Sequence, residues 1–231
     1  MNAPSHIVFR FTTLLLAILL GMQCVWLLLA ELSRPGIDRL PTDATSAAAA
    51  AKQRGTAAWA ASIGAIRGGL WAESAFTYAD LLWADAGANA GLTQALARVR
   101  ASLNHALNDA PHESGAWLLL AGLASRYPSP GLDVTEALKM SYYTGPSEQD
   151  LMPLRLRIAA QSDGFADVEI RQFVTRDLRL FVARRQNSAI AAAYNAAAPA
   201  GKRLIEQAVG EIDPSLLESL RASARRRPIP D

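Results

Sequence analysis

Residues 11–30 read FTTLLLAILLGMQCVWLLLA, a run of 20 positions without a charged side chain. As a helix, a run of this length extends about 30 Å, which matches the hydrocarbon core of a bilayer. Its leucines each favour insertion into lipid, and together they outweigh the cost of the single Gln23. Trp26 lies near the end of the run, where aromatic side chains commonly meet the membrane surface. We therefore predict a transmembrane helix with membrane lipid as its partner.

The alternative for this run is a cleaved signal peptide. Signal sequences have an apolar region of about 7–15 residues and end in a cleavage site of the form A-x-A. The apolar run here is longer, and Leu28, Leu29 and Ala30 match such a site poorly. We therefore expect the helix to stay attached to the rest of the chain.

The residues on either side of the run bear on its orientation. The tail of residues 1–10 contains one basic side chain, Arg10, whereas Arg34 and Arg39 follow the run. Counting only lysine and arginine slightly favours a cytoplasmic body. A short tail before one long apolar run is, however, typical of a signal anchor whose body is exported. We expect a single-pass protein of a bacterial inner membrane with its soluble domain in the periplasm.

The composition of the chain favours helices. Hydrophobic residues make up 51% of the chain and charged residues 19%, so the chain as a whole is not of the disordered class. Alanine and leucine dominate, and both lose little entropy on entering a helix. The net charge of +2 gives no basis for nucleic-acid binding. Because Cys24, the one cysteine, lies within the apolar run, the rest has no disulfide and no cysteine-based metal site.

Proline, glycine and charge divide the rest of the chain. Residues 31–43 contain two prolines and a glycine and are interpreted as a linker. Residues 44–221 are predicted to form an α-helical domain, and residues 222–231 an arginine-rich flexible tail. Residues 87–91 are predicted to be a loop. From apolar periodicity, breakers and capping signals we expect helices at about 57–68, 70–86, 92–109, 114–126, 133–143, 147–160, 166–185, 187–197, 200–209 and 214–223.

Local polar signals refine some of these boundaries. Thr42 or Asp43 is expected to cap the first helix after the linker, and Asp213 precedes a first-turn proline. Ser147 followed by an acidic residue three positions later is a capping-box pattern. Asp167 and Arg171 have the spacing of a favourable ion pair on one helix.

Two segments of the domain align at a spacing of 35 residues. Leu103 pairs with Leu138, Ala106 with Ser141, and Pro111 with Pro146, and three looser pairs continue the alignment. A period near 34 with helix–turn–helix content is typical of tetratricopeptide repeats. The alternative is an irregular α-domain whose leucines share this spacing.

The stretch ALNDAPHESGAWLLLAGLA, residues 106–124, resembles the junction between two tetratricopeptide repeats. Trp117, Leu120, Ala121 and Ala124 match the aromatic, leucine and small positions of the first helix of a repeat, and Pro111 matches the preceding terminal proline. The resemblance covers about residues 92–161, two repeats at most. It implies stacked helical hairpins, an α-solenoid that binds peptides or proteins rather than turning over a substrate.

The resemblance has departures as well as matches. Met152 stands at the aromatic position of the second repeat, and Ser141 stands at the position of its alanine. The chain as a whole also resembles single-pass envelope proteins of alanine- and arginine-rich bacteria. That wider resemblance implies a role in the cell envelope.

The sequence contains no P-loop, dinucleotide-binding glycine motif, zinc-protease motif or nucleophile elbow. His105, His112 and Glu113 lie close together in sequence and are the one arrangement that suggests a metal. His105 lies on the polar side of its helix, so we expect solvated histidines, with no metal and no cofactor.

Aromatic and arginine side chains near the end of the resemblance are the candidates for contacting a partner. Arginine recognises carboxylates and other anionic groups through its planar fork of donors. The alternatives are a helix end that packs on the next repeat and a solvated charged face. The candidate partner-binding residues are Tyr142, Tyr143, Arg155, Arg157, Arg176 and Arg179.

Three functions follow from these features. The first is a membrane-tethered scaffold or adaptor that binds a protein partner in cell-envelope assembly. The resemblance to envelope proteins implies polysaccharide assembly as a more specific form of this role. The second is an oligomeric structural subunit of a membrane complex, in which the small residues of 57–68 form contacts between copies. The third is an enzyme with a carboxylate site, such as Glu113 with Asp109 or Glu136.

Overall fold

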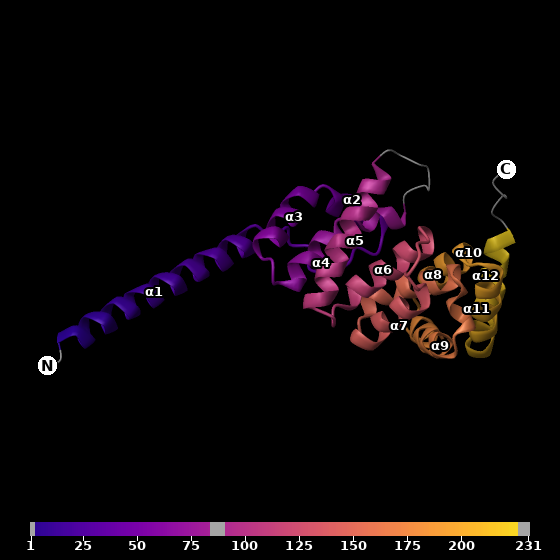
Figure 1. Ribbon diagram of the computed structural model, residues 1–231. Coiled ribbons are helices and arrows are strands. Elements are labelled where there is room, and N and C mark those ends of the chain that lie inside the picture. Colours follow the sequence, from indigo (N-terminus) through magenta and orange to yellow (C-terminus); the bar gives the residue numbers. More distant parts are fainter. Residues whose placement is uncertain (1–2, 84–90, 226–231) are drawn as a thin grey trace.

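The computed structural model describes residues 3–83 and 91–225, and every regular element in these two ranges is a helix. Figure 1 shows one long helix, α1, which projects from a body formed by the other helices. The helix α1 covers Ala3–Leu32 and contains the predicted run of residues 11–30. Within the described ranges, Val8–Leu32 is the one stretch long and apolar enough to cross a membrane. The expected all-α class and the expected apolar helix are both confirmed, and the helix is longer at both ends than predicted.

The chain leaves α1 through residues 33–43 and enters α2 (Ala44–Ala51). Of the two expected caps, Asp43 is the one used, because its carboxylate accepts hydrogen bonds from the backbone N–H groups of Thr45 and Ser46 (both 2.9 Å). An acidic side chain at this position also complements the positive end of the helix dipole.

The helix expected over 57–68 ends earlier than predicted, since α3 covers Arg54–Ile63. A side chain at Gly64 would place its Cβ 2.3 Å from Leu70 Cδ1, so any larger residue at this turn would require Leu70 to move. The small residues Ala57 and Ala61 of α3 are fully buried within the molecule. They therefore do not present the free face on which the prediction of contacts between copies rested.

The prediction of a single helix over 70–86 is also wrong. The structure has α4 (Gly68–Phe76) followed by a separate 3-10 helix, η1 (Ala79–Leu82). The Thr77 hydroxyl donates to Ser74 O (2.7 Å), and Arg54 Nε donates to Thr77 O (3.2 Å). In a continuous helix the Leu81 N–H would donate to Thr77 O, whereas here it donates to Tyr78 O (3.1 Å) and Thr77 O accepts from Arg54. The expected loop over 87–91 lies almost wholly outside the described residues.

The middle of the body matches the prediction closely. It consists of α5 (Leu92–Asp109), α6 (Ser114–Arg126) and α7 (Val134–Thr144). Asp133 caps α7 through hydrogen bonds from two backbone N–H groups of its first turn. The pair α4 and α5 and the pair α6 and α7 have the most extensive helix contacts in the described parts of the chain. Leu103 and Leu138, which align at the 35-residue spacing, are both fully buried.

The helix expected to begin at Ser147 begins later. Residues Gln149–Leu151 form the 3-10 helix η2, and α8 covers Met152–Gln161. The residue that precedes η2 is Glu148 rather than Ser147, and no side chain caps η2. The capping box predicted at Ser147 is therefore absent.

The next elements are η3 (Asp163–Ala166) and α9 (Val168–Ala183). The predicted ion pair between Asp167 and Arg171 is wrong. The Asp167 carboxylate caps α9 and lies 3.4 Å from Lys139 Nζ, whereas Arg171 donates to Phe165 O (2.9 Å). A capping side chain points along the helix axis and cannot also reach a residue one turn further on.

Three helices complete the body: α10 (Asn187–Ala196), α11 (Pro199–Ile212) and α12 (Pro214–Arg225). Asp213 caps α12 as predicted. Because α12 continues through Arg225, the tail boundary predicted at 222 falls inside a helix. Gly201 of α11 lies so close to α8 that a Cβ there would be 2.4 Å from Ala160 O.

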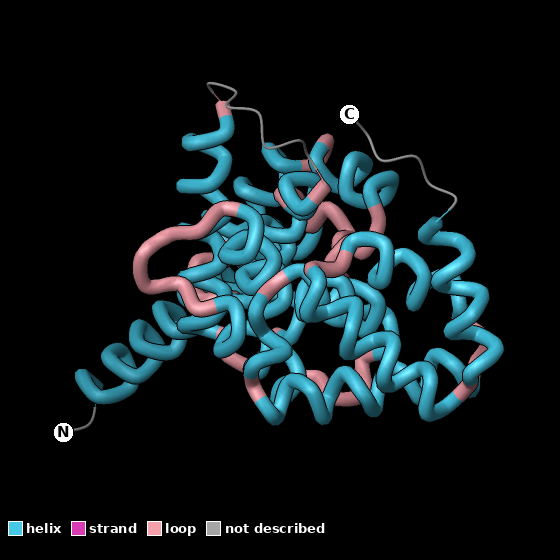
Figure 2. The backbone as a smooth tube through the Cα atoms, turned by 90° about the vertical axis from the view of Figure 1, so that its right-hand side faces the viewer, coloured by secondary structure: helices cyan, strands magenta, loops and turns pink. Residues whose placement is uncertain are grey.

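One continuous hydrophobic core runs through the body from Leu40 to Leu220. A second, smaller cluster of Ala30, Ala61 and Leu70 joins the end of α1 to α3 and α4. Figure 2 shows the body as helices connected mostly by short loops. After α7 the pairwise order changes, because α8 packs more extensively on α10 than on its neighbour α9.

Candidate functional site

Arg155, a predicted partner-binding residue, lies in the interior of the body. Its side chain is fully buried between α7 and α8. Its guanidinium donates to Ser141 Oγ (3.0 Å), Ser141 O (2.5 Å) and Gly145 O (2.9 Å). Burial lowers the pKa of Arg155, and the nearby Tyr142 and Asp177 act in the opposite direction. The side chain thus supplies donors to the end of α7, where the last carbonyl groups of a helix lack partners within the helix.

Tyr142 lies beside Arg155 and connects α7 to α9. Its hydroxyl donates to Asp177 Oδ2 (3.0 Å), and its ring stacks on Phe173 with the centroids 4.7 Å apart. The Arg155 guanidinium carbon lies 4.7 Å from the Tyr142 ring centroid. Burial raises the pKa of Tyr142 well above its ordinary value, and the Asp177 charge adds to that effect. Burial also raises the pKa of the Asp177 carboxyl, against the hydrogen bond from Tyr142.

The buried network of Arg155, Tyr142, Asp177 and Ser141 is therefore part of the core. Tyr142 is 1% exposed and Arg155 is 0% exposed, so a partner cannot touch either without moving α9. The prediction that these two residues contact a partner directly does not fit their positions. Burial of an arginine depends on its tertiary neighbours, and no local signal in the sequence distinguishes it from a solvated one.

Tyr143, Arg176 and Arg179 lie on the surface, on α7 and α9. The Tyr143 hydroxyl donates to Glu169 Oε2 (2.8 Å), and its ring meets the Phe173 ring edge-on at 5.8 Å. The Arg176 guanidinium lies 5.8 Å from the Phe173 ring centroid. These residues form the α7–α9 patch, defined as Tyr143, Glu169, Phe173, Arg176 and Arg179. The patch combines exposed aromatic surface with two cationic side chains.

Arg157, the last of the candidates, belongs to a different place in the body. Its guanidinium carbon lies 5.6 Å from the ring centroid of Trp83, and the residue is half-buried. It lines a cavity of about 230 Å³ together with Leu82, Arg126 and Gln161. Burial lowers the pKa of Arg157, and the charge of Arg126 acts in the same direction. The six predicted residues therefore do not form one surface.

A cavity of about 510 Å³ lies between the linker after α1, the turn before α6 and the segment before α8. Four acidic residues line it: Asp38, Glu113, Glu148 and Asp150. Burial raises the pKa of the Glu113 carboxyl, and the Glu148 charge adds to this effect. Arg39 reaches across to Asp150, with 2.5 Å between Nη1 and Oδ2.

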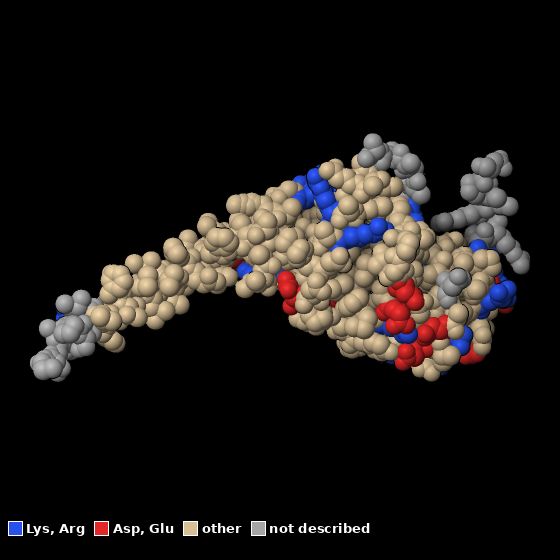
Figure 3. Space-filling view, in the orientation of Figure 1, with Lys and Arg blue, Asp and Glu red and all other residues tan. Residues whose placement is uncertain are grey.

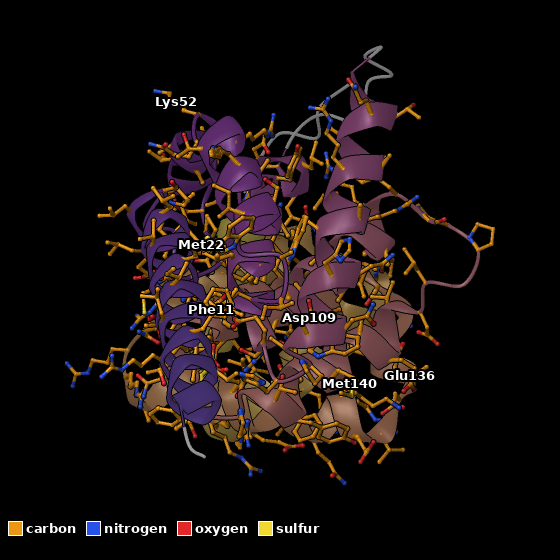
Figure 4. The ribbon with its side chains drawn as sticks, turned by 60° about the vertical axis from the view of Figure 1, so that its left-hand side comes forward. Phe11, Met22, Lys52, Asp109, Glu136 and Met140 are labelled. Atoms are coloured by element: carbon orange, nitrogen blue, oxygen red, sulfur yellow. The ribbon has the colours of Figure 1, made fainter. Side chains whose placement is uncertain are left out.

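The carboxylates predicted to join Glu113 in a catalytic pair are elsewhere. Asp109 lies at the end of α5 and Glu136 on α7, as Figure 4 shows, and neither lines the cavity that contains Glu113. Glu136 is paired with Lys139 (2.5 Å from Oε1 to Nζ). Asp109 and Glu136 were predicted as partners from their residue type and their closeness in sequence. In the fold, Glu148 is the glutamate that lines the same cavity as Glu113.

The histidines considered as metal ligands are also separated in their contacts. The His105 ring stacks on Trp71 with the centroids 4.4 Å apart, and His112 is exposed in the turn before α6. Among the residues that the structure describes, no group of three or more histidine, cysteine, aspartate or glutamate side chains has the arrangement of a metal site.

The comparisons with known proteins identify no relative. No family model, no curated protein and no solved structure matches this chain. The function proposed below therefore depends on the sequence and on the contacts described above.

Proposed function

We propose that this chain is a membrane-anchored helical-repeat scaffold or adaptor that binds a protein partner in cell-envelope assembly. In this proposal α1 spans the inner membrane once, and the body lies in the periplasm as a short array of helical hairpins. The observation that carries the proposal is the outward-facing apolar surface of α1, in which every residue from Phe11 to Leu29 is exposed. Figure 3 shows that this helix has almost no charged surface between its grey end and the body.

The helix pairs of the body support the repeat interpretation. The pairs α4–α5 and α6–α7 pack as successive hairpins, and residues aligned at the 35-residue spacing are buried at equivalent places. Stacked hairpins of this kind expose long surfaces that suit extended partners better than small substrates. The later helices α10, α11 and α12 would then close the end of the array.

The α7–α9 patch is the proposed site of partner contact. Tyr143 is 51% exposed, and Arg176 and Arg179 follow one another on the exposed side of α9. Arginine and aromatic side chains are the residue types that contribute most to protein interfaces. A partner segment with acidic side chains would suit this patch.

Membrane extraction tests the anchor. The full chain is expected to stay in the membrane pellet after a sodium carbonate wash, because the apolar run gains several kcal/mol from lipid. A variant that lacks residues 1–32 is the control, and it is expected in the supernatant. Release of the full chain by carbonate would contradict the proposal.

Site-directed crosslinking tests the partner. A photoreactive phenylalanine in place of Tyr143 in the full chain is expected to give one discrete crosslinked product in membranes. Arg179→Glu is expected to weaken that product at least severalfold, whereas Arg98→Glu, an exposed charge reversal on α5, leaves it unchanged. Equal crosslinking in both variants would count against the patch.

A fusion placed after Asp231 tests the orientation. A reporter enzyme that is active only in the cytoplasm is expected to stay inactive there, and one that requires export is expected to be active. The reverse pattern would place the body in the cytoplasm.

A further inference from the structure

The turn between α3 and α4 lies beside the last turns of α1. The Trp26 indole Nε1 donates to Ile63 O at 2.7 Å, although the two residues are 37 positions apart. Ala30, one turn after Trp26, is fully buried in a cluster with Ala61 and Leu70. Figure 1 shows α3 next to the end of α1. The chain in α3 therefore runs back along α1, from the level of Ala30 toward the level of Trp26.

The position of Trp26 gives the depth of this turn. Glu31, the first charged residue after the apolar run, lies five positions after Trp26. At a rise of about 1.5 Å per residue, Trp26 lies roughly 7 Å inside that charged boundary. When α1 spans a bilayer, Ile63 is held at the same depth. This depth corresponds to the boundary between lipid headgroups and acyl chains, where interfacial segments lie about 5–10 Å deep.

The surface of the turn has the composition of a membrane-facing segment. Ile66 is 83% exposed and Trp59 is 47% exposed, two of the few large apolar side chains of the body that face outward. Residues 55–66 contain no charged side chain. Arg67, which ends this uncharged stretch, is paired with Glu31 at 2.8 Å. Figure 3 shows that the uncharged surface of α1 continues onto the adjoining part of the body.

The backbone of the turn is also suited to an environment with little water. Ile63 O accepts from the Trp26 indole, Gly64 O from the Arg67 backbone N–H (2.6 Å), and Ala65 O from the Trp71 indole (3.0 Å). The Ser62 hydroxyl donates to Trp59 O at 2.7 Å. An unpaired carbonyl group would cost several kcal/mol in lipid, so each of these hydrogen bonds lowers the cost of insertion.

We propose that residues 59–66 form a second membrane contact, an interfacial wedge that enters the headgroup region beside α1 with Ile66 and Trp59 facing lipid. This inference rests on the proposed membrane anchoring, because the depth of the wedge is set by α1. The occupant of the surface is the lipid bilayer rather than a second copy of the chain. A copy would need the same uncharged face, which in the spanning protein is turned toward the membrane.

Depth-dependent fluorescence quenching tests the wedge in the full chain. Cys24→Ser provides a cysteine-free background, and an environment-sensitive dye is attached to Ile66→Cys, Leu16→Cys or Val168→Cys. Val168 is the matched control, because it is 57% exposed and apolar but lies on α9. The protein is placed in vesicles of phosphatidylethanolamine and phosphatidylglycerol that contain lipids brominated near the carbonyl group or near the chain end.

The expected results separate the wedge from the anchor. The dye at Ile66→Cys is quenched at least severalfold more by shallow bromines than by deep ones, the dye at Leu16→Cys shows the reverse, and the dye at Val168→Cys is not quenched. Quenching at Leu16→Cys without quenching at Ile66→Cys would overturn the wedge and leave the anchor standing. No quenching at either position would overturn both. An Ile66→Cys dye that is shielded yet not quenched, and that crosslinks to another copy, would also overturn the wedge.

A charge substitution provides a second measurement. Ile66→Asp is tolerated by folding, since the side chain is 83% exposed, but it opposes insertion. With the dye at Ser62→Cys, Ile66→Asp is expected to reduce shallow quenching at least severalfold, and Val168→Asp is expected to leave it unchanged. Unchanged quenching in Ile66→Asp would show that the turn does not enter the lipid.

Discussion

Two networks among the described residues contain an arginine and a buried carboxylate, and they differ in what they connect. At the junction with α1, Arg34 donates to both Glu31 and Glu73, so one guanidinium joins the end of the long helix to α4. Between α7, α8 and α9, Arg155 donates only to neutral oxygens, and Tyr142 holds the Asp177 carboxylate. The comparison shows that the first network attaches two parts of the molecule, whereas the second fixes the packing inside one part.

The burial of the two arginines differs as well. The Arg34 side chain is 33% exposed and Glu73 is 3% exposed, whereas Arg155 and Asp177 are both 0% exposed. An ion pair open to water on one side is screened, and a fully enclosed charge depends entirely on its protein partners. A change in the enclosed network is therefore expected to cost more stability than a change in the screened ion pair.

Arg155→Met is expected to have the largest effect. It removes the three hydrogen bonds to Ser141 and Gly145 and one of the two guanidinium groups near Asp177, which leaves Arg176 at 3.6 Å as the remaining positive charge. Breaking a buried network of this kind costs about 3–5 kcal/mol. Urea unfolding of the full chain in detergent, followed by circular dichroism, measures the change.

The double variant Arg155→Met/Asp177→Asn sharpens this test. Neutralising both charges is expected to restore part of the lost stability, since the remaining amide can still accept from Tyr142. If the loss of stability in the double variant equals the sum of the losses in the two single variants, the two residues are not coupled.

Arg34→Met is expected to cost less, about 2 kcal/mol after allowance for solvent screening. Its main effect is local, because Glu73 Oε2 already has no hydrogen-bond partner and Glu73 Oε1 then loses its own. Hydrogen exchange is expected to become faster in α4 and unchanged in α9. Arg155→Met should give the opposite pattern. Identical exchange profiles in the two variants would show that the two networks do not stabilise different parts of the molecule.

Glu113→Gln tests a third partly buried carboxyl, one whose strongest neighbouring charge is Glu148 rather than an arginine. Burial raises its pKa in the folded state, so the folded protein binds the proton more tightly than the unfolded chain does. The stability of the wild-type chain therefore falls as the pH rises from about 4.5 through the folded-state pKa.

The variant Glu113→Gln is expected to be more stable than the wild type at pH 7.5 and equal to it near pH 4. Thermal unfolding at both pH values measures the difference. Glu218→Gln on the exposed side of α12 is the control. A variant that is equally stabilised at both pH values would show that the effect is not due to ionisation.

Tyr143→Phe is expected to have the smallest effect on stability, within about 0.5 kcal/mol, since it removes one exposed hydrogen bond to Glu169. Its effect on partner capture is expected to be small as well, because the exposed ring remains and a photoreactive phenylalanine at this position likewise lacks the hydroxyl. A large loss of stability would place Tyr143 with the core network instead of the α7–α9 patch.

Local signals predicted the helices well where they are self-contained. The limits of α6 follow from proline and serine before it and Tyr127–Pro128 after it, and Asp43 and Asp213 cap the helices that they were expected to cap. Each of these signals acts within a few residues of chain. They therefore persist whatever the tertiary fold does.

Predictions that depended on distant contacts were less successful. The carbonyl group of Thr77, just after α4, accepts from Arg54, and the buried Arg155 donates to Ser141 and Gly145. Neither contact has a sequence pattern, since the partners are 10 to 23 positions apart. The pairing of Glu113 with Glu148 belongs to the same class, whereas the exposed positions of Tyr143, Arg176 and Arg179 agree with their helical periodicity.

The joint between Trp26 and Ile63 has a mechanical consequence. Ala30 packed on Ala61, and Glu31 paired with Arg67, fix α1 to the body at several points, so no free hinge separates them. A span that tilts to fit a thinner bilayer must rotate everything attached to it. The helices α7 and α9 lie in the part of the body away from α1, as Figure 1 shows. Bilayer thickness would then change the distance between the α7–α9 patch and a partner held in the same membrane.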